Sequence, residues 1–355
     1  TDRTSDTQGE NQSYSVDVSQ LGGMYAEKIH LVDNGQGLGV RNAGHIGASA
    51  GSVKIDSQGK IVNEGFIGGS ENAELNAKKN IENRGTVYAK AQAQLNAQNI
   101  DNKQGVIAGK QVQLNANNVD NRKQSDKGSL IVASEKVSIK AKNLDNSGTK
   151  SNGQNEQGIK ATALELQADN LTNQQGGIYV SQKADISLTD KLVNQQGEIL
   201  SDGELHIKGD KNTASIDNNE GRVHAGEKLA ITAKKLENEG QISSTGDADI
   251  ALKDSFTLNK AFQVDGHLQF STDGKFTNKT QLRTGQGVTV KAAEIDNPTG
   301  SEIASQVTHI VTSQLTNRGL IDGVKNRIDA ESLNNLGTGR LYGNHLSIAS
   351  KNLTN

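Results

Sequence analysis

The sequence repeats one short phrase along most of its length, and this repetition restricts the chain to a small set of folds. Between Leu114 and Asn146 the phrase occurs twice, as Leu-x-Ala-x-x-Val-x-Asn and as Ile-x-Ala-x-x-Leu-x-Asn. A Gly usually follows two to four residues after the Asn. Most copies lie 18 to 21 residues apart, and their Asn residues are Asn42, Asn63, Asn83, Asn102, Asn121, Asn146, Asn173, Asn194, Asn218, Asn238, Asn278, Asn297, Asn317, Asn335 and Asn355.

The apolar residues of each copy keep fixed distances from the Asn. An Ile, Leu, Val or Phe stands two positions before it, and in most copies an aliphatic residue stands seven positions before it. Within each short segment the apolar spacing is two, which is the period of a β-strand, and the helical period of 3.6 is not sustained. Each repeat therefore predicts three short strands separated by turns.

A repeat of this length is too small to bury its own apolar face, but stacked copies bury each other's. The composition agrees, because only 32% of the 355 residues are hydrophobic and 3% are aromatic, while the net charge is only −3. A thin interior of aliphatic ladders suits these values better than disorder does. We expect an all-β, right-handed parallel β-helix of about 16 coils and about 75 Å in length, with the hand taken from parallel crossovers.

The recurring Asn has a structural explanation in such a stack. Asn tolerates the left-handed backbone conformation at a sharp turn, and the following Gly permits a positive φ. Equivalent Asn side chains in coils about 4.8 Å apart can also bond each other along the axis. We therefore predict an Asn ladder at a turn rather than a catalytic column. At position 258 the ladder lapses, because Leu258 replaces Asn there.

The repeats resemble the haemagglutinin repeats of filamentous haemagglutinin and of contact-dependent growth inhibition protein A. Two segments, Val16 to Ala26 and Gly39 to Ala48, further resemble the stretch that follows the secretion domain in those proteins. The resemblance implies a segment 1–36 that joins a secretion domain to the shaft, and a repeat shaft over 37–355, cut from a longer protein.

The same resemblance implies a function. Members of this family are two-partner-secreted exoproteins, so the expected partner during export is an outer-membrane transporter, and the expected location is the bacterial outer surface. A non-catalytic shaft would display a distal receptor-binding or toxin region to a neighbouring or host cell. The alternatives are a shaft whose side binds a receptor, glycan or bacterial partner directly and, more remotely, a polysaccharide lyase.

The composition argues against several other kinds of partner and of chemistry. With no basic block and a net charge of −3, nucleic-acid binding is not expected. The absence of Cys removes disulfides and thiolate chemistry, and no apolar run reaches the ~18 residues of a membrane helix. We expect no obligate oligomer, although an open coil at a cut end would fray or self-associate unless capped.

The acidic residues directly before the repeated Asn are the best candidates for a catalytic or cation-binding site. Glu82, Asp101, Asp120 and Asp145 should stack along one outer edge, where a cation could sit. The alternative is a solvated edge neutralised by nearby basic residues, namely Arg84, Lys103 and Arg122. No calcium-loop spacing supports the cation, so no catalytic, cofactor-binding or metal-binding residue is predicted.

Other residues have simple structural explanations. The seven His (His30, His45, His206, His224, His267, His309 and His345) show no metal-ligand spacing, and Gly35 to Gly39 predicts a turn rather than a phosphate loop.

Four phenylalanines and three polar insertions also depart from the regular repeat. Phe256, Phe262, Phe270 and Phe276 should pack in the core near the lapse, with an exposed patch as the alternative. Three polar insertions, 122–127, 148–158 and 209–215, predict surface loops that either bind a partner or are tolerated excursions. The polar residues 1–15 should be mobile unless they pair with an upstream domain.

Overall fold

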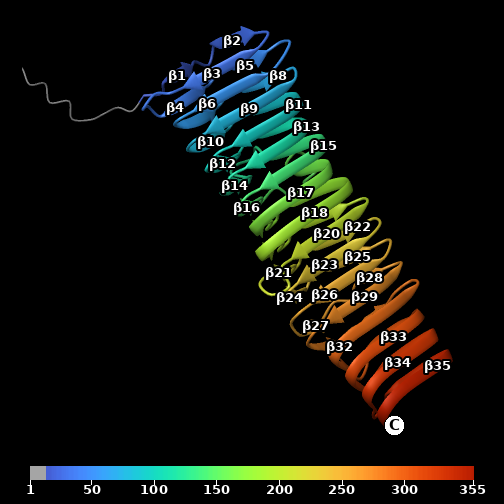
Figure 1. Ribbon diagram of the computed structural model, residues 1–355. Coiled ribbons are helices and arrows are strands. Elements are labelled where there is room, and N and C mark those ends of the chain that lie inside the picture. Colours follow the sequence, from blue (N-terminus) through green and yellow to red (C-terminus); the bar gives the residue numbers. More distant parts are fainter. Residues whose placement is uncertain (1–12) are drawn as a thin grey trace, which may run out of the picture.

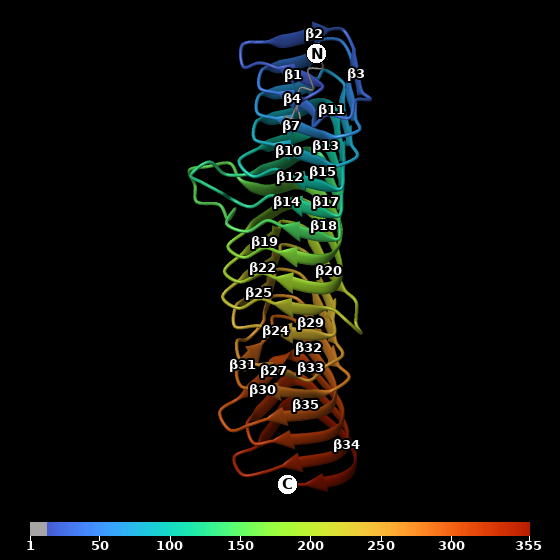
Figure 2. The same ribbon diagram turned by 90° about the vertical axis from the view of Figure 1, so that its left-hand side faces the viewer.

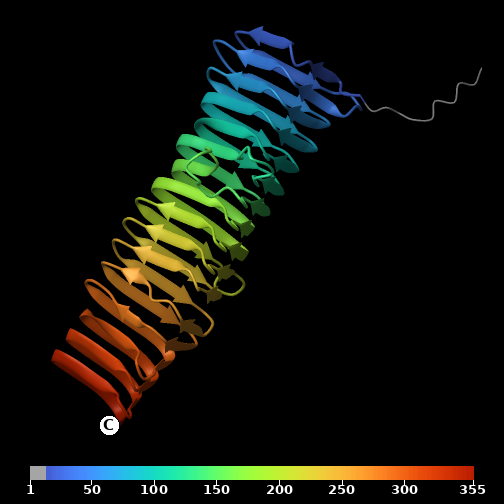
Figure 3. The ribbon, with the colours of Figure 1, turned by 180° about the vertical axis from the view of Figure 1, so that it is seen from behind.

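The computed structural model describes residues 13–355, which form one long stack of parallel strands (Figures 1 and 3). Every regular element in this range is a strand, and the strands wind into a β-solenoid of about 17 turns. The expectation of a parallel β-helix with a repeat of about 20 residues is confirmed. The hand of the winding stays a prediction.

The strands follow the sequence without interruption by any other element. Their bounds are β1 (Val16–Val18), β2 (Gly23–Ala26), β3 (Ile29–Asp33), β4 (Gly39–Asn42), β5 (His45–Ala48), β6 (Val53–Ser57), β7 (Lys60–Asn63), β8 (Phe66–Gly69), β9 (Asn72–Ala77), β10 (Asn80–Asn83), β11 (Thr86–Asn96), β12 (Asn99–Asp101), β13 (Val106–Asn115), β14 (Asn118–Asp120), β15 (Leu130–Lys140), β16 (Asn143–Asp145), β17 (Gly158–Thr172), β18 (Gly177–Val193), β19 (Glu198–Ser201), β20 (Glu204–Gly209), β21 (Ser215–Asp217), β22 (Arg222–Ala225), β23 (Leu229–Ala233), β24 (Lys235–Glu237), β25 (Gln241–Ser244), β26 (Ala248–Leu252), β27 (Phe256–Leu258), β28 (Gln263–Val264), β29 (His267–Thr272), β30 (Lys275–Asn278), β31 (Gln281–Arg283), β32 (Gly287–Asn297), β33 (Glu302–Asn317), β34 (Leu320–Asn335) and β35 (Arg340–Thr354).

Each coil contributes three strand segments, and each segment pairs with the equivalent segment of the neighbouring coils. Strands β4, β5 and β6 pair in parallel with β7, β8 and β9. The pairing aligns the repeat positions: Leu95 lies opposite Leu114, and Leu114 lies opposite Ile139. These side chains are almost completely buried, so the core is a set of aliphatic ladders along the axis.

The described part of segment 1–36 follows the same pattern. Strands β1, β2 and β3 pair with β4, β5 and β6, so the stack already begins there. The expected turn at Gly35 to Gly39 lies in the bend between β3 and β4. The division at residue 36 stays a prediction, and the first twelve of the polar residues 1–15 lie outside the described residues.

The four phenylalanines lie in the core, as predicted. Phe256 pairs with Phe276 in the adjacent coil, and all four side chains are at most 4% exposed. Their ring centroids lie 4.9 to 6.5 Å apart. Leu258, which is completely buried, takes the corner position of the missing Asn. Aromatic packing thus replaces amide hydrogen bonds at this corner.

The three insertions lie in loops, as expected, but at two different corners. Insertions 122–127 and 148–158 both leave the stack just after a ladder Asn and project from one side of the rod (Figure 2). They touch, because Asn155 donates to the backbone oxygen of Asp126 at 2.7 Å. Insertion 209–215 interrupts a different corner, between β20 and β21.

Candidate functional site

The recurring Asn side chains form the predicted ladder inside the corner of each coil. The Nδ2 group of each Asn donates to Oδ1 of the next, at 2.8 to 2.9 Å from Asn42 through Asn238. The ladder resumes from Asn278 to Asn355. Most of these side chains are completely buried, and many also donate to a backbone oxygen of the following coil, as Asn83 does to Val106. The ladder therefore holds neighbouring coils together and leaves no amide available for catalysis.

The backbone at this corner differs from the expectation. The ladder Asn residues have negative φ; the left-handed residues lie two positions later, at Gln104, Gln175, Gln196 and Glu220, with φ between 49° and 65°. The prediction that Asn itself adopts this conformation is wrong, because each Asn must hold its side chain inward for the ladder.

The Gly of the repeat has the predicted role in some coils and another role in others. Gly148, Gly300 and Gly337 adopt positive φ, between 58° and 84°, as predicted. At Gly65, Gly85 and Gly221, φ is not positive. A Cβ atom at each would instead lie 2.0 Å from a backbone oxygen of the preceding coil. Glycine is required because adjacent coils approach closely there, which leaves no space for a side chain.

Two further Asn ladders lie on the outside of the rod, and the sequence analysis missed them. One joins Asn76, Asn96 and Asn115, and the other joins Asn80, Asn99, Asn118, Asn143 and Asn170. In these ladders each Asn donates toward the preceding coil, opposite to the buried ladder. The recurrence of Asn directly before the aliphatic residue of the repeat was the signal that could have revealed the second one.

The acidic column lies along one edge, as its register predicted. Glu82, Asp101, Asp120 and Asp145 are paired partners in successive strands. Basic residues alternate with them: Arg84 bonds Asp101 at 2.7 Å, Lys103 lies 3.5 and 3.6 Å from Asp101 and Asp120, and Arg122 bonds Asp120 at 2.8 Å. The edge is therefore an ion-pair network rather than an open cation site.

The ion-pair network changes the pKa of Asp120. Burial opposes its ionisation, but hydrogen bonds from the Arg122 side chain and backbone, with the charges of Arg122 and Lys103, lower its pKa below the ordinary value. The carboxylate is therefore stabilised in its charged form by the protein itself.

The histidines are distributed along the rod, and several face a carboxylate of an adjacent coil. His30 lies 2.9 Å from Asp56, and His309 lies 2.8 Å from Asp329. His206 lies between Asp185 and Glu204, at 3.2 and 3.4 Å. Strand register brings Asp185 opposite His206, although these two residues are distant in the sequence. Within residues 13–355, no group of three or more His, Cys, Asp or Glu is arranged to hold a metal ion.

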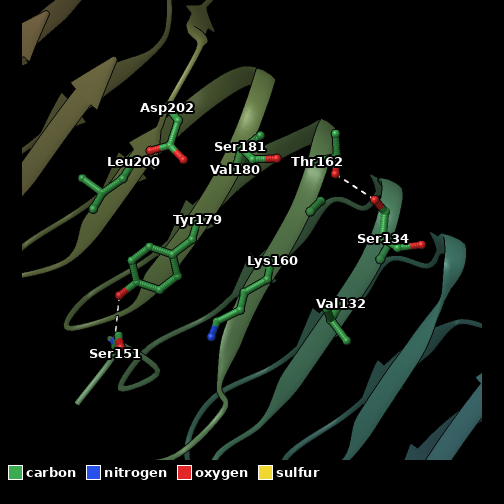
Figure 4. A pocket seen from close by; sticks show the side chains of 12 residues that line it. Val132, Ser134, Ser151, Lys160, Thr162, Tyr179, Val180, Ser181, Leu200 and Asp202 are labelled. Atoms are coloured by element: carbon green, nitrogen blue, oxygen red, sulfur yellow. Dashed lines mark hydrogen bonds between the residues drawn. The ribbon is translucent and has the colours of Figure 1, made fainter. Parts of the chain in front are cut away.

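A groove of about 470 Å³ lies beside insertion 148–158, which contributes Ser151 to its lining (Figure 4). Tyr179 is its central aromatic residue, and its ring lies over Gly177, where a Cβ atom would be 2.5 Å from the ring. The hydroxyl of Tyr179 accepts a hydrogen bond from the Ser151 backbone and donates one to Glu198, at 2.7 and 3.2 Å. The sequence did not predict this groove, because it depends on how an insertion folds back onto strands.

The two large polar side chains at the centre of the groove are Tyr179 and Lys160. Burial above all, together with the nearby charge of Glu198, raises the pKa of Tyr179 to about 12, so its phenol stays protonated near neutral pH. Lys160 is paired with Glu156 at 2.7 Å. The Tyr179 phenol is thus not a ready general base, whereas both side chains remain able to bind.

The fold and these sites define an elongated solenoid of repeats whose equivalent side chains hold neighbouring coils together. No helix among residues 13–355 is long and apolar enough to cross a membrane. The chain belongs to the haemagglutinin repeat family, whose model matches residues 11–65, 71–148, 202–279 and 261–355.

Several known proteins are similar to this chain. It is 49% identical over 76 residues to Toxin CdiA of Yersinia pestis, which covers 21% of this chain and 2% of that protein. It is 22% identical over 317 residues to the 16S rRNA endonuclease CdiA of Enterobacter cloacae, or 89% of this chain and 8% of that protein. It is 28% identical over 293 residues to the protein adenylyltransferase and cysteine protease IbpA of Histophilus somni, or 80% and 7%. The chain thus spans a small part of each relative, and no solved structure matches it significantly.

Proposed function

We propose that this chain is a rigid, non-catalytic shaft segment of a large two-partner-secreted filament at the bacterial outer surface. The observation that carries this proposal is the buried Asn ladder, which adds a side-chain hydrogen bond to the backbone pairing between successive coils. Such a stack resists bending, because each coil is fixed to both neighbours across its whole cross-section.

The relatives support this role for the segment. Their names state nuclease, adenylyltransferase and protease activities, whereas the matched regions of the three relatives described above make up only 2 to 8% of their lengths. A repeat region beside a distant effector fits a spacer that carries the effector outward. Export through an outer-membrane transporter and retention at the surface follow from the family resemblance and belong to the same proposal.

Removal of whole coils tests the shaft function. Deletion of residues 84–102 removes one complete coil, since Asn83 and Asn102 occupy equivalent positions. In the full-length secreted protein, we expect export and folding to persist, with the filament shorter by about 4.8 Å per deleted coil. Serial deletions of this kind should reduce contact with a target cell in step with length, as electron microscopy and a cell-contact assay would show.

A deletion that breaks the register is the matched control. Removal of residues 84–93 takes out half a coil and would place polar positions inside the core. We expect this variant to misfold and to fail to reach the surface. If whole-coil deletions left contact unchanged at every length, reach would not be the function of the segment.

A further inference from the structure

The groove beside insertion 148–158 consists of two rows of outward-facing side chains that run along the rod axis (Figure 4). The first row places Val132, Lys160, Tyr179 and Leu200 opposite one another in β15, β17, β18 and β19. The second row lies two residues further along the chain, where the strand pairing is interrupted and β19 has already ended. It contains Ser134, Thr162, Ser181 and Asp202, all of which line the groove.

From these rows we propose that the groove is a binding site for a neutral oligosaccharide that lies parallel to the rod axis. This inference goes beyond the shaft role and does not depend on it. The site would let the side of the shaft adhere directly to a glycan, in addition to carrying a distal region.

The aromatic residue at the centre is held rigidly. The Tyr179 ring rests on Gly177, and its hydroxyl is fixed at both sides by Ser151 and Glu198. A ring that is already immobile loses little conformational entropy on binding. The apolar C–H face of a sugar ring packs well against such an aromatic surface, and the Lys160 ammonium, whose Nζ lies 6.0 Å from the centroid of the Tyr179 ring, borders that surface.

The polar row supplies hydrogen-bonding groups for hydroxyls. The side chains of Ser134, Ser181 and Asp202 make no side-chain hydrogen bond to any residue within 13–355, so their capacity is available to a ligand. Thr162, by contrast, already donates to the backbone oxygen of Ser134 at 2.7 Å. A carboxylate and hydroxyls in one row match the donors and acceptors of a polyol.

The charges favour a neutral ligand over a polyanion. Lys160 is already paired with Glu156, and Glu198 lies 3.8 Å from Arg222. Among the described residues Asp202 has no close ion-pair partner, so its negative charge is not neutralised. The Asp202 carboxylate would therefore repel a sulfated chain.

The length and form of the groove favour an oligomer over a single sugar or a peptide. The four coils span about 14 Å along the axis, and an extended chain of sugar rings advances about one coil per ring. A peptide would need free backbone groups to add as a strand, whereas these strands already pair with their neighbours on both sides.

Titration calorimetry with the purified chain tests the site, with cellohexaose, mannohexaose and chitohexaose as neutral probes and a heparin hexasaccharide as the anionic probe. We expect at least one neutral probe to bind and Tyr179→Ala to weaken it about tenfold or more. Tyr342→Ala is the matched control, since Tyr342 is another exposed tyrosine, 51% exposed, and lies in β35, many coils along the stack from β15 to β19, so it should leave affinity unchanged.

A second variant blocks the groove by adding a side chain, so that its effect does not depend on removing the contacts of Tyr179. Thr162→Trp would fill the groove while the strands stay paired, and we expect it to abolish binding with an unchanged circular dichroism spectrum. Absence of binding by all neutral probes would overturn the proposal. Stronger binding of heparin, or equal losses in the Tyr179 and Tyr342 variants, would also overturn it.

Discussion

Leu258 lies directly opposite Asn278 in the parallel pair of β27 and β30, so that a buried aliphatic side chain stands where other coils place their ladder Asn. The donor–acceptor chain of amides stops at Asn238 and begins again at Asn278. The interruption shows that a coil can close its corner in either of two ways, by hydrogen bonding or by packing against Phe256 and Phe276.

Leu258→Asn should therefore be tolerated better than an equivalent change elsewhere in the core. The new amide would have ladder partners in the coils on both sides, whereas Leu166→Asn would bury an amide without them. We expect Leu166→Asn to lower the free energy of unfolding by about 1–3 kcal/mol more than Leu258→Asn does. Urea denaturation measures both, and equal losses would show that the corner no longer accepts an amide.

Asn102→Ala tests the contribution of the buried ladder. Asn102 donates to Asn121 and to the backbone oxygen of Leu130, and it accepts from Asn83. Its loss leaves buried polar groups without partners, and we expect about 1–3 kcal/mol of destabilisation in urea denaturation. Asn118→Ala in the exposed outer ladder is the control, with an expected change within about 0.5 kcal/mol. A similar loss in both variants would contradict the ladder's role in stability.

Gly85→Ala tests the close approach of coils. The added Cβ would lie 2.0 Å from the backbone oxygen of Gly65, so the coils must separate locally. We expect a loss of about 1–3 kcal/mol and a lower thermal midpoint. At Gly22 the nearest atom to an added Cβ is the Ser19 hydroxyl at 3.1 Å, so Gly22→Ala should have a smaller effect in the same melt.

The acidic edge predicts a specific loss of stability in acid. Because the protein lowers the pKa of Asp120 below the ordinary value that this carboxyl has in the unfolded chain, its stabilising contribution is fully present above that ordinary value and is lost as pH falls through the folded pKa. Asp120→Asn should lower stability at pH 7 and flatten its decline between about pH 5 and pH 2. Denaturation curves across this range provide the measurement, with Asp190→Asn on exposed β18 as the control. A decline as steep as that of the unaltered chain would exclude Asp120 as a source.

The periodicity of the sequence predicted those features that depend only on which residues stack. Once equivalent positions are aligned, the buried aliphatic ladders, the Asn ladder, the Phe core and the acidic edge with Arg84 and Arg122 all follow from the register. Each of these features repeats from coil to coil, so the same signal occurs many times along the chain.

Features that depend on local backbone geometry or on non-repeating loops were not predictable in this way. The left-handed conformation at Gln104 and the coil contact at Gly85 arise from distances of a few ångströms between backbones. The groove at Tyr179 forms where a single insertion returns to the stack and Ser151 reaches the phenol. Because this arrangement occurs only at this place in the fold, no repeated sequence pattern predicts it.

The opposite directions of the buried and outer amide ladders have an electrical consequence. In the buried ladder every side-chain amide dipole points the same way, and aligned hydrogen bonds polarise one another. The outer ladders point the other way, but they are shorter and lie beside water, which screens them. The rod is therefore electrically polar along its axis, so its two ends present different fields to whatever lies beyond them.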